Sequence, residues 1–160
     1  MKIRVIWFGR PGASPHEEQV ESYRVRVSRR WPAEDLPVRP AAGGRGADPR
    51  RTLRREARSV LERIPANWKM VLLDERGEQL GSEALAGLLQ AEETSGTPGL
   101  AFVVGSDLGL DPSLGRRAWK RISLGPLTLP HLLARLVLWE QLYRSADILG
   151  GGSYHRRNVQ

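Results

Sequence analysis

The chain has 160 residues, a formal net charge of +7 at pH 7 and no cysteine. This length is typical of one domain with a buried core, and the missing cysteines exclude disulfides, thiol nucleophiles and cysteine-ligated metals. The apolar runs are far shorter than the roughly 18 residues of a membrane span, and residues 1–10 do not form a secretion signal. We therefore expect one cytoplasmic domain over residues 1–160, without membrane contact, whose tail is flexible from about residue 150.

Strand-like and helix-like segments alternate along the chain. Short runs rich in apolar and β-branched residues predict strands over 2–8, 36–40, 69–74, 100–104 and 120–124. Capping residues and Ser-Pro or Asp-Pro pairs predict helices over about 14–30, 48–64, 82–90, 111–118 and 129–149. This alternation favours an open α/β sheet, mostly parallel, with helices on both faces.

The excess positive charge lies in residues 1–63, which carry 15 basic and 8 acidic side chains, whereas residues 64–160 carry ten of each. Most of these basic residues are arginines, whose planar guanidinium group matches phosphate. One interpretation of this charge is an anionic partner such as nucleic acid. The other is a genome whose codon usage favours arginine and so makes the surface generally basic. The candidate RNA contacts lie in a glycine-rich loop and the helix after it: Arg45, Arg50, Arg51, Arg54 and Arg55.

Three loops follow predicted strands, after Asp74, Val104 and Leu124. Ligands of open α/β sheets bind outside the carboxyl ends of strands, so these loops are candidate walls of a site. The glycines of loop 105–109 allow close approach of a ligand, although a tight turn explains them equally well. Segment 123–131 is apolar but irregular, which is typical of an apolar ligand site or of a buried connection.

The last predicted helix is apolar nearly all round, which favours a homodimer, with an ordinary core helix as the alternative. His16, His131 and His155 lack the spacing of metal ligands, so we expect no metal site. We interpret His131 as a local cap at the helix start. The end of the chain, with Tyr154, His155 and Arg156, either closes over a nucleotide or is a disordered basic tail.

Several of these segments together resemble the ribosomal RNA large-subunit methyltransferase H family of knotted SPOUT methyltransferases. The matching segments are 73–77, 103–105 with Gly109, 123–131, 140–144 and 154–156. The resemblance implies a C-terminal trefoil knot, a homodimer and binding of S-adenosyl-L-methionine. It assigns the cofactor to Leu73, Gly105, Leu124, Gly125, Pro126, Leu127, Thr128 and Leu129. It also implies methylation of N3 of a pseudouridine in 23S ribosomal RNA, in the stem-loop that bridges the ribosomal subunits, on the assembled ribosome.

The chain departs from the family pattern at two points. Ser106 stands where the family usually has a second glycine, and Asp107-Leu108 replaces a common proline–glutamate pair. If that glycine has a positive φ, serine costs roughly 1 kcal/mol, and cofactor affinity is reduced.

Methylation of N3 also requires that its proton leaves. We hypothesise that His155 accepts this proton or orients the base, that Tyr154 stacks on the uracil, and that Arg156 holds a phosphate or offsets developing charge. Two alternatives stay open: a related SPOUT enzyme that acts on transfer RNA, and a ribosome-binding factor that has lost methyl transfer.

Overall fold

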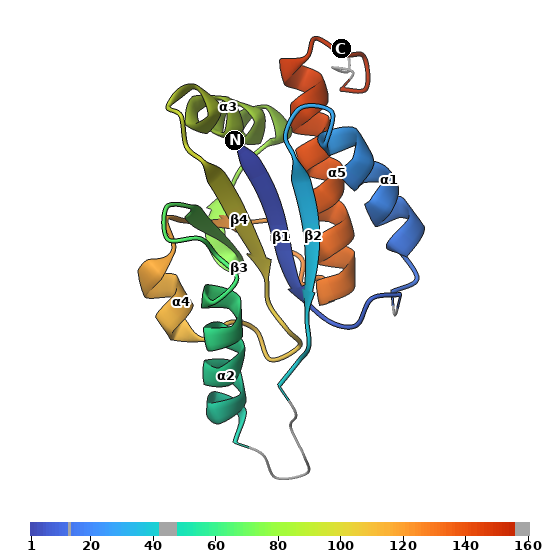
Figure 1. Ribbon diagram of the computed structural model, residues 1–160. Coiled ribbons are helices and arrows are strands. Elements are labelled where there is room, and N and C mark those ends of the chain that lie inside the picture. The colour runs from blue at the N-terminus through green and yellow to red at the C-terminus, as the bar shows by residue number, and fades with distance from the viewer. Residues whose placement is uncertain (13, 42–47, 156–160) are drawn as a thin grey trace.

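The computed structural model describes residues 1–12, 14–41 and 48–155 (Figure 1). Its strands are β1 Lys2–Phe8, β2 Ala33–Val38, β3 Lys69–Gln79, β4 Gly99–Val104 and β5 Lys120–Ser123. Its helices are α1 Glu17–Val27, α2 Pro49–Leu61, α3 Ser82–Thr94, α4 Pro112–Arg117 and α5 His131–Leu149. The strands form a sheet in the order β2-β1-β4-β3-β5, and each neighbouring pair is parallel. The predicted α/β sheet is thereby confirmed.

The sheet is covered on both faces, each with its own apolar core (Figure 1). On one face, α1, α3 and α5 pack against a cluster that includes Phe102, Trp31 and Leu138. On the other face, α2 and α4 cover a smaller cluster that includes Phe8 and Val60. The central strand β4 is buried along its whole length because both of its faces are covered.

Two boundaries differ from the sequence prediction for local reasons. Strand β2 begins at Ala33, three residues earlier than predicted, because the Ile3 N–H already donates to the Pro32 carbonyl at 2.9 Å. Strand β3 continues to Gln79, through a segment predicted as a turn. Its pairing with β5 shifts register, so that Leu73 and Glu78 both face Ile122. A Cβ on Gly77 would lie 2.6 Å from the Ile122 backbone, so this close approach requires glycine.

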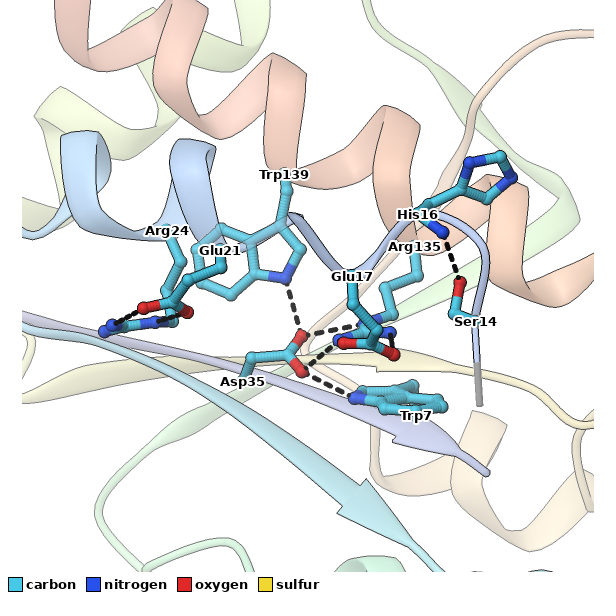
Figure 2. Close-up of polar contacts among 9 residues, drawn as sticks. All are labelled: Trp7, Ser14, His16, Glu17, Glu21, Arg24, Asp35, Arg135 and Trp139. Carbon is cyan, nitrogen blue, oxygen red and sulfur yellow. Dashed lines mark hydrogen bonds and ion pairs between the residues drawn. The ribbon is translucent and has the colours of Figure 1, made fainter. Parts of the chain in front are cut away.

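A buried polar network ties α5 to the edge of the sheet (Figure 2). Arg135 is only 2% exposed, and its guanidinium lies 3.7 Å from the Trp7 ring centroid. The Asp35 carboxylate accepts hydrogen bonds from Arg135 and from the indole N–H groups of Trp7 and Trp139. Glu17 accepts two further bonds from Arg135. Four elements, α1, α5, β1 and β2, therefore meet at one buried guanidinium.

The packing within one chain explains much of the apolar character of α5. Its Leu138, Trp139 and Leu142 are fully buried against α1, α3 and the sheet. Leu133 and Val137 are only partly buried.

Within the described residues, no helix combines the length and apolarity needed to cross a bilayer. The same residues contain no cluster of three acidic or histidine side chains arranged to hold a metal ion.

Candidate active site

A hollow of about 890 Å³ lies beside the middle of β3, at the ends of β4 and β5 and at the start of α5. This volume falls within the roughly 300–1,000 Å³ that is typical of small-molecule sites. The loops at the carboxyl ends of β4 and β5 form much of its wall, as expected for an open α/β sheet. Its walls are residues 72–76, 104–112, 123–125 and 127–131, with Gly115, Arg121 and Ala134.

The structure brings most of the predicted cofactor residues together in this hollow. The predicted residues that line it are Leu73, Gly105, Leu124, Gly125, Leu127, Thr128 and Leu129. Pro126 belongs to the same loop but does not line the hollow. These residues come from strand β3, the loop after β4 and the loop after β5, so their meeting in one place is a result of the fold.

Glycines shape the two loops that face each other across the hollow. A Cβ on Gly105 would lie 2.9 Å from the Gly109 carbonyl oxygen, so the turn closes tightly only without a side chain there. Gly109 has a φ of +86° and donates its N–H to the Ser106 carbonyl at 2.8 Å. In the opposite loop, Gly125 has a φ of +129°, which other residues rarely adopt. Backbone groups therefore form much of the wall.

Ser106 is accommodated without the backbone strain that the sequence suggested. Among the described residues, only glycines have a positive φ, so Ser106 has an ordinary backbone conformation. Its hydroxyl donates to Glu56 Oε2 at 2.8 Å, and this glutamate of α2 is 4% exposed. The other Glu56 oxygen accepts the Ala41 N–H at 3.3 Å. The serine therefore links the loop after β4 to α2.

His131 and Asp107 form a pair at the mouth of the hollow. His131 Nδ1 lies 2.8 Å from Asp107 Oδ1, and both residues line the hollow. His131 was expected to cap the start of α5, yet no side-chain hydrogen bond caps the N-terminus of this helix. The partner comes from the loop after β4, 24 residues earlier, so sequence spacing gave no sign of this pair.

The arginine-rich face of α2 is exposed. Asp48 caps the helix by accepting the Arg50 N–H, and Ala57 and Val60 face the core. The predicted RNA contacts Arg50, Arg51, Arg54 and Arg55 are all exposed, whereas Arg45 lies outside the described residues. A hydrogen bond from Ser113 lowers the pKa of Asp111, and the nearby Arg54 and Arg116 lower it further. Because Asp111 lines the hollow, Arg54 lies within electrostatic reach of it.

The predicted catalytic residues Tyr154 and His155 come after the C-terminal end of α5, whereas the hollow lies at the start of this helix (Figure 1). This helix has 19 residues and therefore spans roughly 28 Å between the hollow and the C-terminal end. The Tyr154 hydroxyl donates to Glu140 at 3.1 Å, and its ring lies 4.7 Å from the Arg144 guanidinium. His155 Nε2 lies 3.6 Å from Glu83, and Arg156 lies outside the described residues. Within one chain, the structure does not bring Tyr154 or His155 to the hollow.

The environment of Tyr154 keeps its hydroxyl protonated. The pKa of Tyr154 is raised, first by its hydrogen bond with Tyr23, then by burial and by the Glu140 carboxylate. The two hydroxyl oxygens lie 3.4 Å apart. As long as the tail lies in this position, Tyr154 is suited to stacking and hydrogen bonding and not to proton abstraction.

Comparison with known proteins supports the same family as the sequence motifs. A family model described as "Predicted SPOUT methyltransferase" matches residues 1–155. The chain is 40% identical over 156 residues to the ribosomal RNA large subunit methyltransferase H of Stenotrophomonas maltophilia, covering 98% of this chain and 99% of the relative. It is 36% identical over 155 residues to the protein of that name from Geotalea uraniireducens, covering 97% and 99%. The one from Solidesulfovibrio magneticus is 40% identical over 153 residues, covering 96% and 97%. The chain therefore belongs to the SPOUT methyltransferases, the family whose members carry the C-terminal trefoil knot.

Proposed function

We propose that this methyltransferase uses S-adenosyl-L-methionine to methylate N3 of a pseudouridine in 23S ribosomal RNA, in the stem-loop that bridges the ribosomal subunits. The hollow is the observation that carries the proposal, because seven predicted cofactor residues from β3 and from the loops after β4 and β5 meet in it. The relatives named as ribosomal RNA large subunit methyltransferase H supply the RNA class. Action on the assembled ribosome places the protein in the cytoplasm.

The residues of the hollow fit an adenosine-containing methyl donor. The apolar side chains of Leu73, Leu124 and Leu129 suit the faces of an adenine ring. The backbone of loop 123–129 offers amide and carbonyl groups to its edge, and Gly105 leaves room for close approach. These residues would hold the cofactor, and the charged side chains that line the hollow would face the RNA.

A homodimer resolves the separation between the hollow and the tail. A two-fold axis that passes beside the middle of α5, perpendicular to the helix, would pair the two α5 helices antiparallel, so that the tail of one chain meets the hollow of its partner. The partly buried Leu133 and Val137 on α5 offer an apolar surface for such contact. In this arrangement Tyr154 stacks on the target base, while His155 and Arg156 orient the base and hold a phosphate.

The arginines of α2 provide the sequence-independent part of RNA binding. Exposed guanidinium groups neutralise phosphates and release counterions, which adds affinity with little base selection. We therefore assign ribosome docking to Arg45, Arg50, Arg51, Arg54 and Arg55. The choice of target base then follows from the shape of the ribosome around the site.

The experiment that tests the function is mass mapping of 23S ribosomal RNA from a strain that lacks the gene. Wild-type protein supplied on a plasmid should restore one methyl group on one pseudouridine. Gly105→Leu should fail to restore it, because the added side chain meets the Gly109 carbonyl. Gly87→Ala on α3 is the matched control, because nothing lies within 4 Å of its added Cβ. A methyl group lost from transfer RNA instead, or from no RNA, would contradict the proposal.

A further inference from the structure

The reaction proposed above needs a group that accepts the N3 proton beside the methyl donor. The identification of that group rests on the proposed function. Attack by N3 requires the reacting atoms to come within about 3–3.5 Å of each other. The acceptor must lie within hydrogen-bond reach of the same nitrogen. It must therefore belong to the hollow or to a segment brought to it by the partner.

The described wall of the hollow contains a single histidine, His131, among its titratable side chains. Histidine is the side chain that ordinarily titrates near neutral pH. The other charged side chains on this wall are Asp74, Glu75, Arg76, Asp107, Asp111 and Arg121. The carboxylates of Asp111 and Asp74 already have structural partners. Asp111 caps α4 through the Ser113 N–H, and Asp74 accepts the Arg76 N–H and lies 3.8 Å from Arg121.

Asp107 gives His131 the orientation that a proton acceptor needs. A carboxylate 2.8 Å from Nδ1 favours the tautomer with the proton on Nδ1, so Nε2 keeps its lone pair. The same carboxylate stabilises the imidazolium that forms when Nε2 takes a proton. The Asp107 side chain is 86% exposed, so this pair adds little to folding stability.

His155 has a different environment within the same chain. It lies between Glu83 at 3.6 Å and Arg144 at 3.5 Å, at the far end of α5. It does not line the hollow of its own chain. His131, in contrast, lies in the wall of the hollow of its own chain, whatever the assembly.

We propose that His131, oriented by Asp107, accepts the N3 proton of the target base. When bound, S-adenosyl-L-methionine supplies the methyl group: the carbon–sulfur bond breaks as the carbon–N3 bond forms, and sulfur keeps the electron pair. The N3–H bond breaks in the same reaction, its electrons remain on the base, and the proton moves to His131 Nε2. His155 then orients the base from the partner subunit.

Single-turnover methylation of ribosomes that lack the modification tests the assignment. His131→Ala should slow the reaction by roughly 100-fold or more, and the fall in rate on the acid side of neutrality should disappear. Added imidazole should restore part of the rate, and calorimetry should show unchanged cofactor affinity. His16→Ala is the matched control, because this histidine lies at the start of α1 and should keep the wild-type profile.

Imidazole nitrogen NMR adds a readout that does not depend on catalysis. The chain has three histidines, so selective labelling and the alanine variants assign each signal. Neutral His131 should carry its proton on Nδ1, and Asp107→Asn should shift it toward Nε2 while lowering the methylation rate.

Two results would overturn the assignment: a full rate with the acid limb intact in His131→Ala, or an unchanged tautomer in Asp107→Asn. Failure of the wild-type protein to methylate 23S ribosomal RNA would instead contradict the proposed function itself.

Discussion

Replacing Asp35 by asparagine should destabilise the fold by about 3–5 kcal/mol. Asp35 accepts four hydrogen bonds, two on each carboxylate oxygen, from Trp7, Trp139 and Arg135 (Figure 2). Asparagine retains one of the two acceptor oxygens and turns an N–H₂ group toward donors. Two hydrogen bonds to a charged group are then lost, each worth about 1.5–3 kcal/mol. Glu17 still pairs with Arg135, which keeps the loss from being larger.

Urea unfolding at neutral pH, followed by tryptophan fluorescence, measures this loss. For a chain of this size it corresponds to a fall in melting temperature of roughly 6–20 °C. Glu34→Gln is the matched control on the same strand, because its side chain is 51% exposed and pairs with Arg4 at the surface. That variant should lose less than about 1 kcal/mol. Equal stability of the two variants would refute the idea that Asp35 anchors the network.

Three further predictions follow from the contacts of other residues. Ser106→Ala should weaken S-adenosyl-L-methionine binding by up to about tenfold in calorimetry, because the loop after β4 loses its bond to the buried glutamate of α2; unchanged affinity would show that this bond does not order the loop. Hydrogen bonds from Arg135 lower the pKa of Glu17, so its contribution to stability is present above about pH 4.5 and is lost as the pH falls through the lowered value. Glu17→Gln should therefore flatten the acid side of the stability curve, and an unchanged slope would contradict this. Arg54→Glu should weaken ribosome binding and reduce its salt dependence, whereas Arg29→Glu, on exposed surface at the end of α1, should leave both unchanged; equal losses would argue against a specific basic face.

Local signals in the sequence predicted the elements well. Asp48 and Asp111 were expected to begin helices, and both accept a backbone N–H at the first turn. The buried run 100–104 was expected to be a strand and forms the core of β4. These features depend on neighbours within a few residues, so they can be predicted without knowledge of the fold.

The features that sequence reasoning missed join distant parts of the chain. Arg135 and Asp35 are 100 residues apart, and Ser106 and Glu56 are 50 apart. The register shift at Gly77 depends on the path of β5, which no local pattern reveals. For the candidate site, the lining loops after Val104 and Leu124 could be named in advance because they follow strands, whereas the segment after Asp74 continues strand β3. The pairs of side chains around the hollow could not be predicted, because they depend on how distant segments approach one another in the folded chain.

The most direct test of the account is whether one catalytic site is formed by two copies of the chain. Gly105→Leu damages the hollow, and a chain that ends at residue 152 lacks Tyr154 and His155, so each alone should be inactive on ribosomes. Mixing them in equal amounts under exchange conditions should restore about one quarter of wild-type methylation, because half of the dimers then contain one intact site. A mixture that stays inactive, although light scattering shows mixed dimers, would contradict the account.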